Sequence, residues 1–137
     1  MNVRFAPTKH PRWMLVDDDR EVLRAMSALI ENLAVAEIEC HDSAQSALAA
    51  FAAAPRRYEL VITDLDMPGM DGGALCRIMQ SIAPGQKVIL VTGGNYYDEA
   101  AARAAGFCAL LNKPFPLAVL HETLAATGLA TRAIDGV

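Results

Sequence analysis

Cysteine is scarce in this sequence, and the spacing of the cysteines argues against a zinc site and against a fully disulfide-bonded domain. Only 3 of the 137 residues are cysteine. Their wide separation fits no zinc-ligand pattern, and an odd number of thiols cannot pair completely within one chain. Each cysteine lies in an apolar stretch, so we expect small buried thiols in a reducing compartment. The three are Cys40, Cys76 and Cys108.

Long apolar runs and runs of basic residues are also missing. No stretch is long enough to span a bilayer, and the N-terminus lacks the apolar core of a signal peptide. We therefore expect a cytoplasmic protein that does not bind a membrane. The net charge is −4 and no Lys/Arg run is present, which argues against a basic face for nucleic acid.

The composition that remains is typical of one folded domain. Hydrophobic residues make up 53% and charged residues 20%, which excludes a disordered chain. We expect residues 1–11, with two prolines, to be a flexible leader, and residues 12–127 to form the domain. The tail at 128–137 has no second helical pattern, so no output domain is expected there.

Five short segments predict strands. Four are continuous apolar runs, which is typical of strands buried on both faces of a parallel sheet. A fifth, at 37–41, alternates polar and apolar residues and is expected to be an edge strand. The four continuous runs are 13–16, 60–62, 88–91 and 108–111.

Helical patterns separate these strands. The first predicted apolar stripe contains Val22, Met26, Leu29, Ile30 and Leu33. The second follows an N-cap at Asp42 or Ser43. A segment at 98–105 is helix-prone but has only alanine on its apolar face, so we expect it to be weakly anchored. The other stripes are Ala44, Ala47, Leu48 and Phe51; Leu75, Ile78, Met79 and Ile82; and Leu117, Leu120 and Leu124, after Pro116.

Strand and helix therefore alternate five times. Right-handed crossovers between parallel strands then predict an α/β fold, a doubly wound five-stranded parallel sheet with helices on both faces. In open sheets of this kind, ligands bind beyond the carboxyl ends of the strands.

Polar residues that bear chemistry follow four of the five predicted strands. Asp17 and Asp18 follow the first strand and Asp64 ends the third. Thr92 ends the fourth strand and Lys113 lies just beyond the fifth. Since all these strand ends meet at one rim of the sheet, we expect the five side chains to lie together.

Charge balance at this rim favours a divalent cation. Two carboxylates about 4 Å apart repel by about 4 kcal/mol at an effective dielectric near 20. Lys113 supplies one positive charge, and Mg²⁺ would balance the rest of the three-aspartate cluster. Asp19 and Asp71 are interpreted as solvated loop residues, with Asp71-Gly72 as a turn.

These residues resemble the response regulator receiver family over about residues 12–127. The motifs are Leu-Val-Asp-Asp-Asp at 15–19, Thr-Asp-Leu-Asp-Met-Pro-Gly-Met-Asp-Gly at 63–72, Val-Thr-Gly at 91–93 and Asn-Lys-Pro-Phe at 112–115. The resemblance implies a flavodoxin-like receiver fold with strand order 2-1-3-4-5. It also implies a single-domain signalling protein that catalyses only its own phosphorylation and dephosphorylation.

The resemblance implies a role for each matching residue. Asp64 would accept the phosphoryl group, and Thr92 and Lys113 would contact its oxygens. The backbone N–H groups of Leu65 and Gly93 would complete the cradle. Mg²⁺, with Mn²⁺ as a substitute, would be bound by Asp17, Asp18, Asp64 and the backbone carbonyl of Asp66. The peptide bond between Lys113 and Pro114 is expected to be cis.

The resemblance also implies partners. The phosphoryl donor would be a phosphohistidine of a histidine kinase or of a histidine phosphotransfer protein. The output would be contact with an unidentified downstream protein or onward phosphotransfer, from a monomer or weak dimer. The chain's own His10, His41 and His121 are interpreted as structural or solvated.

One position departs from the family pattern. Leu110 stands three residues before Lys113, where the family has an aromatic side chain that reorients on phosphorylation. We hypothesise that Thr92 still reorients and that the alanine-faced helix at 98–105 moves in response. Asp66 and Gly94 stand where the family tunes the lifetime of the acyl phosphate, and that lifetime stays open.

Two other functions remain as alternatives. One is a receiver-fold binding module that is never phosphorylated, which Leu110 keeps open. The other is a haloacid-dehalogenase-type phosphatase with Asp64 as nucleophile and Asp66 as acid. That alternative leaves the aspartates after the first strand unexplained.

Overall fold

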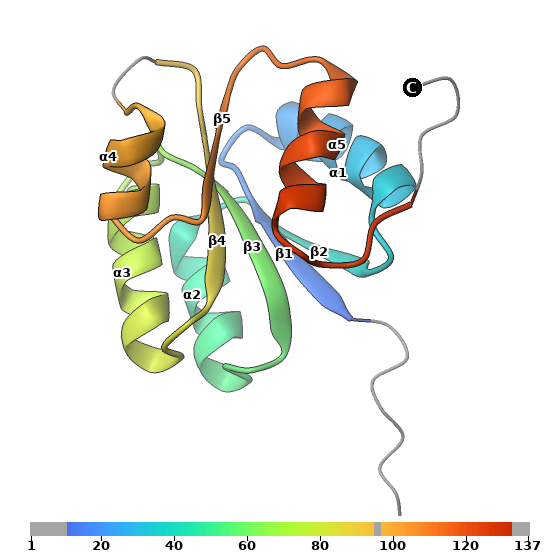
Figure 1. The fold of residues 1–137 in the computed structure, drawn as a ribbon. Helices are drawn as coiled ribbons and strands as arrows, with labels where there is room; N and C mark the ends of the chain where they lie inside the picture. The colour runs from blue at the N-terminus through green and yellow to red at the C-terminus, as the bar shows by residue number, and fades with distance from the viewer. Residues whose placement is uncertain (1–10, 95–96, 133–137) are drawn as a thin grey trace, which may run out of the picture.

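The structure is a computed structural model that describes residues 11–94 and 97–132, so the predicted leader lies almost wholly outside the described residues. Strands and helices alternate along the chain (Figure 1). In chain order they are β1 (Arg12–Val16), α1 (Arg20–Leu33), β2 (Glu37–His41), α2 (Ala44–Ala53), β3 (Tyr58–Asp64), α3 (Gly72–Ile82), β4 (Lys87–Thr92), α4 (Glu99–Ala104), β5 (Ala109–Asn112) and α5 (Leu117–Ala126).

The five strands form one parallel sheet in the order β2-β1-β3-β4-β5. Helices α1 and α5 cover one face of the sheet, and α2, α3 and α4 cover the other (Figure 1). The predicted doubly wound fold and its strand order are therefore confirmed. The carboxyl ends of β1, β3, β4 and β5 lie at the same rim, which is the rim that the sequence predicts for the site.

Alternate residues along each central strand enter two separate apolar cores. In β1, Trp13 and Leu15 pack beneath α1 and α5, whereas Met14 and Val16 pack beneath α2 and α3. Because both faces of the sheet are covered, the inner strands have no polar face. This burial explains why their sequences are continuous apolar runs.

Aspartates and a serine begin four of the five helices. Ser43 caps α2, as predicted, and accepts a hydrogen bond from the Ser46 N–H. Asp19 and Asp71 cap α1 and α3, which corrects their interpretation as solvated loop residues and of Asp71-Gly72 as a turn. Their carboxylates are exposed, yet they accept the first N–H groups of each helix, which have no partner within the helix.

Three predicted core residues are exposed instead. Leu29 is 41% exposed because the buried stripe of α1 runs through Leu23, Met26, Ile30 and Leu33, which rotates Leu29 outward. Ile82 is the last residue of α3 and Leu117 the first of α5. Both lie at helix ends and are exposed.

The cysteines differ in burial. Cys76 is buried in α3 and Cys108 is half-buried, but Cys40 is exposed. The prediction that all three are buried is therefore wrong for Cys40. Cys40 lies in β2, which within residues 11–94 and 97–132 pairs only with β1, so no described strand neighbours its other side.

The segment after α5 contacts the C-terminal end of α1. Thr131 forms an antiparallel bridge with Ala34, and the Arg132 N–H donates to the Leu33 carbonyl at 2.6 Å. Leu129 packs against the core beneath α1 and α5. The described part of the predicted tail is therefore ordered against the end of α1.

Candidate functional site

Three acidic side chains converge at the rim of the sheet. Asp17 and Asp18 follow β1, and Asp64 is the last residue of the neighbouring strand β3. Each offers a carboxylate oxygen, and the three oxygens lie within 4.8 Å of one another. The sequence predicted this cluster because parallel strands deliver their carboxyl ends to one edge.

Lys113 neutralises part of the negative charge of this cluster. Its Nζ lies 3.0 Å from Asp64 Oδ1 and 3.4 Å from Asp17 Oδ2. The residue follows β5, and the Lys113–Pro114 peptide bond is cis, as expected. The Lys113 N–H also donates to the Thr92 carbonyl at 2.9 Å, which ties the β5 end to β4.

Burial and charge act against each other at Asp64. Burial raises the pKa of Asp64, and the negative charges of Asp17 and Asp18 act in the same direction. The ammonium of Lys113 acts to lower this pKa but does not fully offset the other effects. The carboxyl group thus lacks enough positive charge around it, which is the condition that a divalent cation would relieve.

The same contacts stabilise the charged form of the lysine. Burial acts to lower the pKa of Lys113, but its hydrogen bond and attraction to Asp64, with the charge of Asp17, raise the pKa overall. Lys113 is therefore an ammonium at neutral pH and a fixed positive charge in the site.

Asp17 is held in place by backbone groups. Its carboxylate accepts the Asp19 N–H at 2.9 Å, and its own N–H donates to the His41 carbonyl at 3.1 Å. Asp17 is only 3% exposed. The Asp19 N–H and the Lys113 ammonium compensate the buried charge of Asp17. The start of α1 and the site therefore share one hydrogen-bond network.

Gly72 packs against the backbone of Asp64, a contact that the sequence analysis does not predict. Its N–H donates to the Leu65 carbonyl at 2.9 Å. A Cβ at Gly72 would lie 2.3 Å from the Asp64 carbonyl oxygen. The first residue of α3 thus packs directly against the end of β3, and only glycine fits there. The Asp71-Gly72 pair is the sequence signal for this contact, although by itself it predicts a turn.

Thr92 lies at the end of β4 and is 1% exposed. Its hydroxyl accepts the Gly94 N–H at 3.2 Å. Gly93, between the two, is exposed and has open space where a Cβ would stand. The contact of the Gly93 N–H with a phosphoryl oxygen stays a prediction.

Two further predicted contacts involve backbone groups of Leu65 and Asp66. The Leu65 N–H donates to the Val91 carbonyl at 3.1 Å, so its contact with a phosphoryl oxygen stays a prediction. Asp66 is exposed, and its role as a carbonyl ligand likewise stays a prediction.

Leu110 stands where the family has its aromatic switch residue. Two aromatic residues, Phe107 and Tyr97, belong to the same core as Leu110. Leu110 is half-buried and packs against the core beneath α2 and α3. Phe107 is buried, and its ring meets the ring of Tyr97 edge-on at 6.4 Å. The only buried side chain of α4 is Ala102, as the alanine-faced pattern predicted.

Comparison with known families decides what this site belongs to. The family model described as "Response regulator receiver domain" matches residues 14–125. The chain belongs to the response regulator receiver family. Receiver domains are signalling modules of two-component systems rather than conventional enzymes, and phosphoryl acceptance is their general function.

Relatives of this receiver include transcriptional regulators. It is 39% identical over 106 residues to the C4-dicarboxylate transport transcriptional regulatory protein DctD of Rhizobium meliloti, covering 77% of this chain and 22% of DctD. It is 35% identical over 117 residues to the response regulator protein FleR of Pseudomonas aeruginosa, covering 85% of this chain and 24% of FleR. The receiver thus spans less than a quarter of the length of these two curated relatives.

Solved structures share the fold. A response regulator receiver domain protein from Clostridium thermocellum aligns with a TM-score of 0.75 at 25% identity, over 84% of this chain and 91% of that chain. The chemotaxis protein CheY4 of Vibrio cholerae aligns with a TM-score of 0.74 at 24% identity, over 85% and 98%. These alignments confirm the receiver fold that the sequence predicted.

The donor atoms at the rim fit the metal that this family uses. Receiver domains bind Mg²⁺ at an acidic cluster, and here that cluster is Asp17, Asp18 and Asp64. All three offer carboxylate oxygens, which are the hard ligands that Mg²⁺ prefers. None of the helices within residues 11–94 and 97–132 is both long and apolar enough to cross a membrane.

Proposed function

We propose that this receiver accepts a phosphoryl group on Asp64 in a Mg²⁺-dependent reaction in the cytoplasm. The donor is a phosphohistidine of a histidine kinase or histidine phosphotransfer protein. The observation that carries the proposal is the arrangement around Asp64. Its carboxylate is 3.0 Å from Lys113 and within 4.8 Å of the Asp17 and Asp18 carboxylates, at the open rim of the sheet.

The reaction asks the protein mainly for position and charge. The bond between phosphorus and the donor imidazole nitrogen breaks, and a bond between phosphorus and an Asp64 oxygen forms, which gives an acyl phosphate. Negative charge spreads over the three equatorial oxygens during transfer. The carboxylates of Asp17, Asp18 and Asp64, with the Asp66 carbonyl, would hold a Mg²⁺ that would neutralise part of this charge.

Four groups of the chain hold the transferred phosphoryl group. The Lys113 ammonium exchanges one of its carboxylate contacts for a phosphoryl oxygen. The Thr92 hydroxyl, which now accepts the Gly94 N–H, donates to a second oxygen. The N–H groups of Gly93 and Leu65 complete the cradle, and for Leu65 this requires release of the Val91 carbonyl.

The signal leaves through protein contact or onward phosphotransfer. Thr92 is continuous with the segment that leads to α4, and α4 has one buried side chain, Ala102. A reorientation of the Thr92 side chain could therefore move α4 at a small cost in buried contacts. Leu110 cannot supply an aromatic readout, so we assign the response to the Thr92–α4 connection instead.

Intact-mass measurement after incubation with acetyl phosphate and Mg²⁺ tests the acceptor. We expect one added phosphoryl group on the wild type and none on Asp64→Asn. Chelation of Mg²⁺ should abolish the gain, and Mn²⁺ should restore it. No gain on the wild type with acetyl phosphate or several other donors would instead favour a receiver-fold module that is never phosphorylated.

The phosphatase alternative predicts a different result. A haloacid-dehalogenase-type enzyme would release many phosphates per chain from an aryl phosphate, with loss of turnover in Asp66→Asn. Asp66 is exposed, whereas Asp17, which that mechanism leaves unused, is buried in the cluster. The observed burial therefore favours the receiver chemistry.

A further inference from the structure

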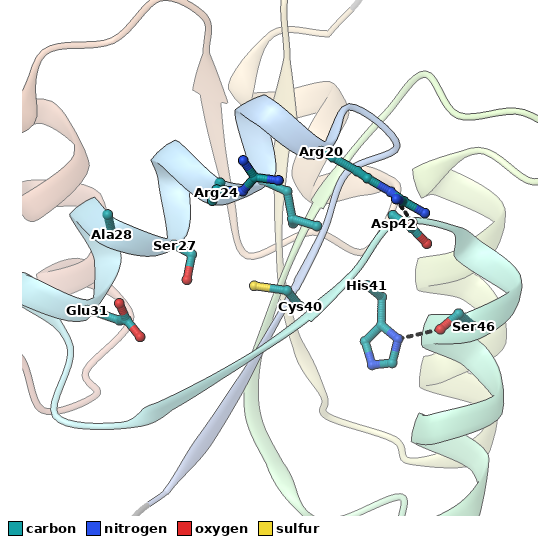
Figure 2. Close-up of a pocket in the computed structure, with 10 residues that line it drawn as sticks. Arg20, Arg24, Ser27, Ala28, Glu31, Cys40, His41, Asp42 and Ser46 are labelled. Carbon is teal, nitrogen blue, oxygen red and sulfur yellow. Dashed lines mark hydrogen bonds and ion pairs between the residues drawn. The ribbon is translucent and has the colours of Figure 1, made fainter.

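An open groove lies along the edge of the sheet, apart from the acidic cluster. It has a volume of about 600 Å³ and runs between α1 and β2 (Figure 2). The exposed Cys40 points from β2 toward the part of α1 that carries Ser27 (Figure 2). None of the carboxylates of the phosphoacceptor cluster lines this groove.

One wall of the groove is an unpaired strand edge. The Glu37 N–H donates to the Pro11 carbonyl, and the His41 carbonyl accepts the Asp17 N–H, so both residues turn their backbone groups toward β1. Backbone direction alternates along a strand, so the N–H and C=O groups of Ile38 and Cys40 point away from the sheet. No hydrogen bond to these outward groups occurs among the described residues.

The other wall carries two opposite charges without ion pairs. Arg24 and Glu31 both line the groove from α1, and both are exposed. Among the ion pairs formed within residues 11–94 and 97–132, neither takes part, whereas the neighbouring Arg20 binds Asp42 at 2.8 Å. Arg24 and Glu31 are seven positions apart, which places them about 10 Å apart along the helix at 1.5 Å per residue.

We propose that this groove is an interface for a second copy of the same chain. The two β2 strands would pair antiparallel about a twofold axis beside Cys40. Two five-stranded sheets would then become one continuous sheet. This interface is independent of the phosphoryl chemistry proposed above.

Charges along β2 select the register. An axis at Glu39 would place Glu39 opposite Glu39 of the second copy, and an axis at Ile38 would place Glu37 opposite Glu39 of that copy. Like charges directly opposite one another are destabilising in antiparallel pairs. An axis at Cys40 instead places Glu39 opposite His41 of the second copy, and it satisfies the outward groups of Cys40 reciprocally.

The charges of α1 locate the same axis independently. A twofold axis between Ser27 and Ala28 brings Arg24 opposite Glu31 of the second copy, twice. Those two small side chains let the helices approach closely. Cys40 and this part of α1 face one another across the groove, so the strand and the helix agree on one axis (Figure 2).

Charge reversal tests the interface without touching the phosphorylation site. We expect sedimentation velocity of the wild type over a concentration series to show a reversible monomer–dimer equilibrium. Arg24→Glu or Glu31→Arg alone should raise the dimer dissociation constant by about tenfold or more, because attraction becomes repulsion at two symmetric sites. The double variant R24E/E31R should return to near the wild-type value, as should an equimolar mixture of the two single variants.

Cross-linking through Cys40 tests the position of the axis. In the background C76S/C108S, diamide should oxidise two Cys40 thiols to one interchain disulfide and be reduced to its hydrazine. Glu31→Arg should slow this cross-linking, and Cys40→Ser should abolish it. All variants should gain one phosphoryl group from acetyl phosphate as the wild type does, which shows that each is folded.

A wild type that stays monomeric at every concentration overturns the proposal. So does a dimer whose dissociation constant is unchanged by Arg24→Glu and Glu31→Arg, because it would use another face. Failure of the double variant and of the mixture to recover association would also overturn it. Loss of phosphoryl uptake in the wild type would contradict the proposed function but not this interface.

Discussion

Lys113 Nζ lies 3.0 Å from Asp64 Oδ1, although 49 positions separate the two residues in the chain. The same ammonium reaches Asp17 at 3.4 Å, across 96 positions. One cation thus links the ends of β1, β3 and β5. Because the cluster holds three carboxylates and Lys113 pairs with only two of them, it carries excess negative charge that a divalent cation would balance.

Relief of this repulsion gives a first prediction. Asp18 is the exposed member of the cluster, so Asp18→Asn removes one negative charge without opening a cavity. In metal-free buffer, we expect the free energy of unfolding to rise by about 0.5–1 kcal/mol. Saturating Mg²⁺ should stabilise the wild type strongly and the variant little, since a ligand that binds only the folded state adds RT ln(1 + [L]/Kd) of stability and the variant binds Mg²⁺ more weakly.

Urea unfolding with a chelator and with Mg²⁺ measures both effects. Glu122→Gln is the control, because it removes one exposed negative charge outside the cluster. Its response to Mg²⁺ should match that of the wild type. An equal Mg²⁺-induced gain in Asp18→Asn and in the wild type would show that Asp18 does not hold the cation.

Two adjacent glycines in α3 give a second prediction. A Cβ at Gly72 would lie 2.3 Å from the Asp64 carbonyl, whereas one at Gly73 would have its nearest contact at 3.4 Å. We expect Gly72→Ala to lower the free energy of unfolding by about 2 kcal/mol and to slow phosphoryl uptake by Asp64. Gly73→Ala should leave both nearly unchanged or raise stability by about 0.5–1 kcal/mol through its better helix propensity.

Chemical denaturation and intact-mass time courses report on this pair. Both variants change glycine to alanine in the same turn of α3, so a difference between them isolates contact with the Asp64 backbone. Similar stability and uptake in Gly72→Ala and Gly73→Ala would show that the close approach does not position Asp64.

The polar network on β2 gives a prediction about pH. The Tyr58 hydroxyl donates to Glu39 Oε2 at 2.7 Å, and Glu39 also binds Arg12 and His41. Burial acts to raise the pKa of Glu39, but these hydrogen bonds together hold it below its ordinary value. Burial and the Glu39 carboxylate raise the pKa of Tyr58 from 10.0 to about 12.

A raised tyrosine pKa means that the neutral phenol is the stabilising form. Its contribution is therefore complete below pH 10 and is lost as the pH rises from about 10 to about 12. Tyr58→Phe should cost about 1–2 kcal/mol at neutral pH, and this difference should shrink across that window. Absorbance of tyrosinate should show the highest-pH ionisation only in proteins that keep Tyr58. A Tyr58 that ionises near 10 would contradict the network.

The weak anchoring of α4 gives a prediction about the response to phosphorylation. Beryllofluoride would mimic the phosphoryl group that we propose for Asp64, so we expect it to change hydrogen exchange at residues 97–107. Thr92→Ala should reduce this change, while exchange near Asp64 still responds to the ligand. Equal protection of residues 97–107 in the wild type with and without beryllofluoride would refute the Thr92–α4 connection.

Much of the fold follows from local pattern. The continuous apolar runs predicted buried parallel strands, and the alternating segment at 37–41 predicted the edge strand β2, with its bounds, because side-chain alternation is a local property. The apolar stripes wrongly predicted burial of three helix residues, which are Leu29, Ile82 and Leu117. Which flank of a helix meets the sheet depends on packing against distant elements, which periodicity alone does not specify.

The sequence by itself determined which chemical groups are present and that they follow strand ends: Asp17, Asp18, Asp64, Thr92 and Lys113. Parallel strands share a direction, so this was enough to predict that the groups meet. Only the tertiary structure decided the fit of Gly72 against Asp64, the exposure of Cys40 and the placement of Arg24 and Glu31 beside the free edge of β2. These features depend on distances between segments remote in sequence, and such distances are set by packing of the whole domain.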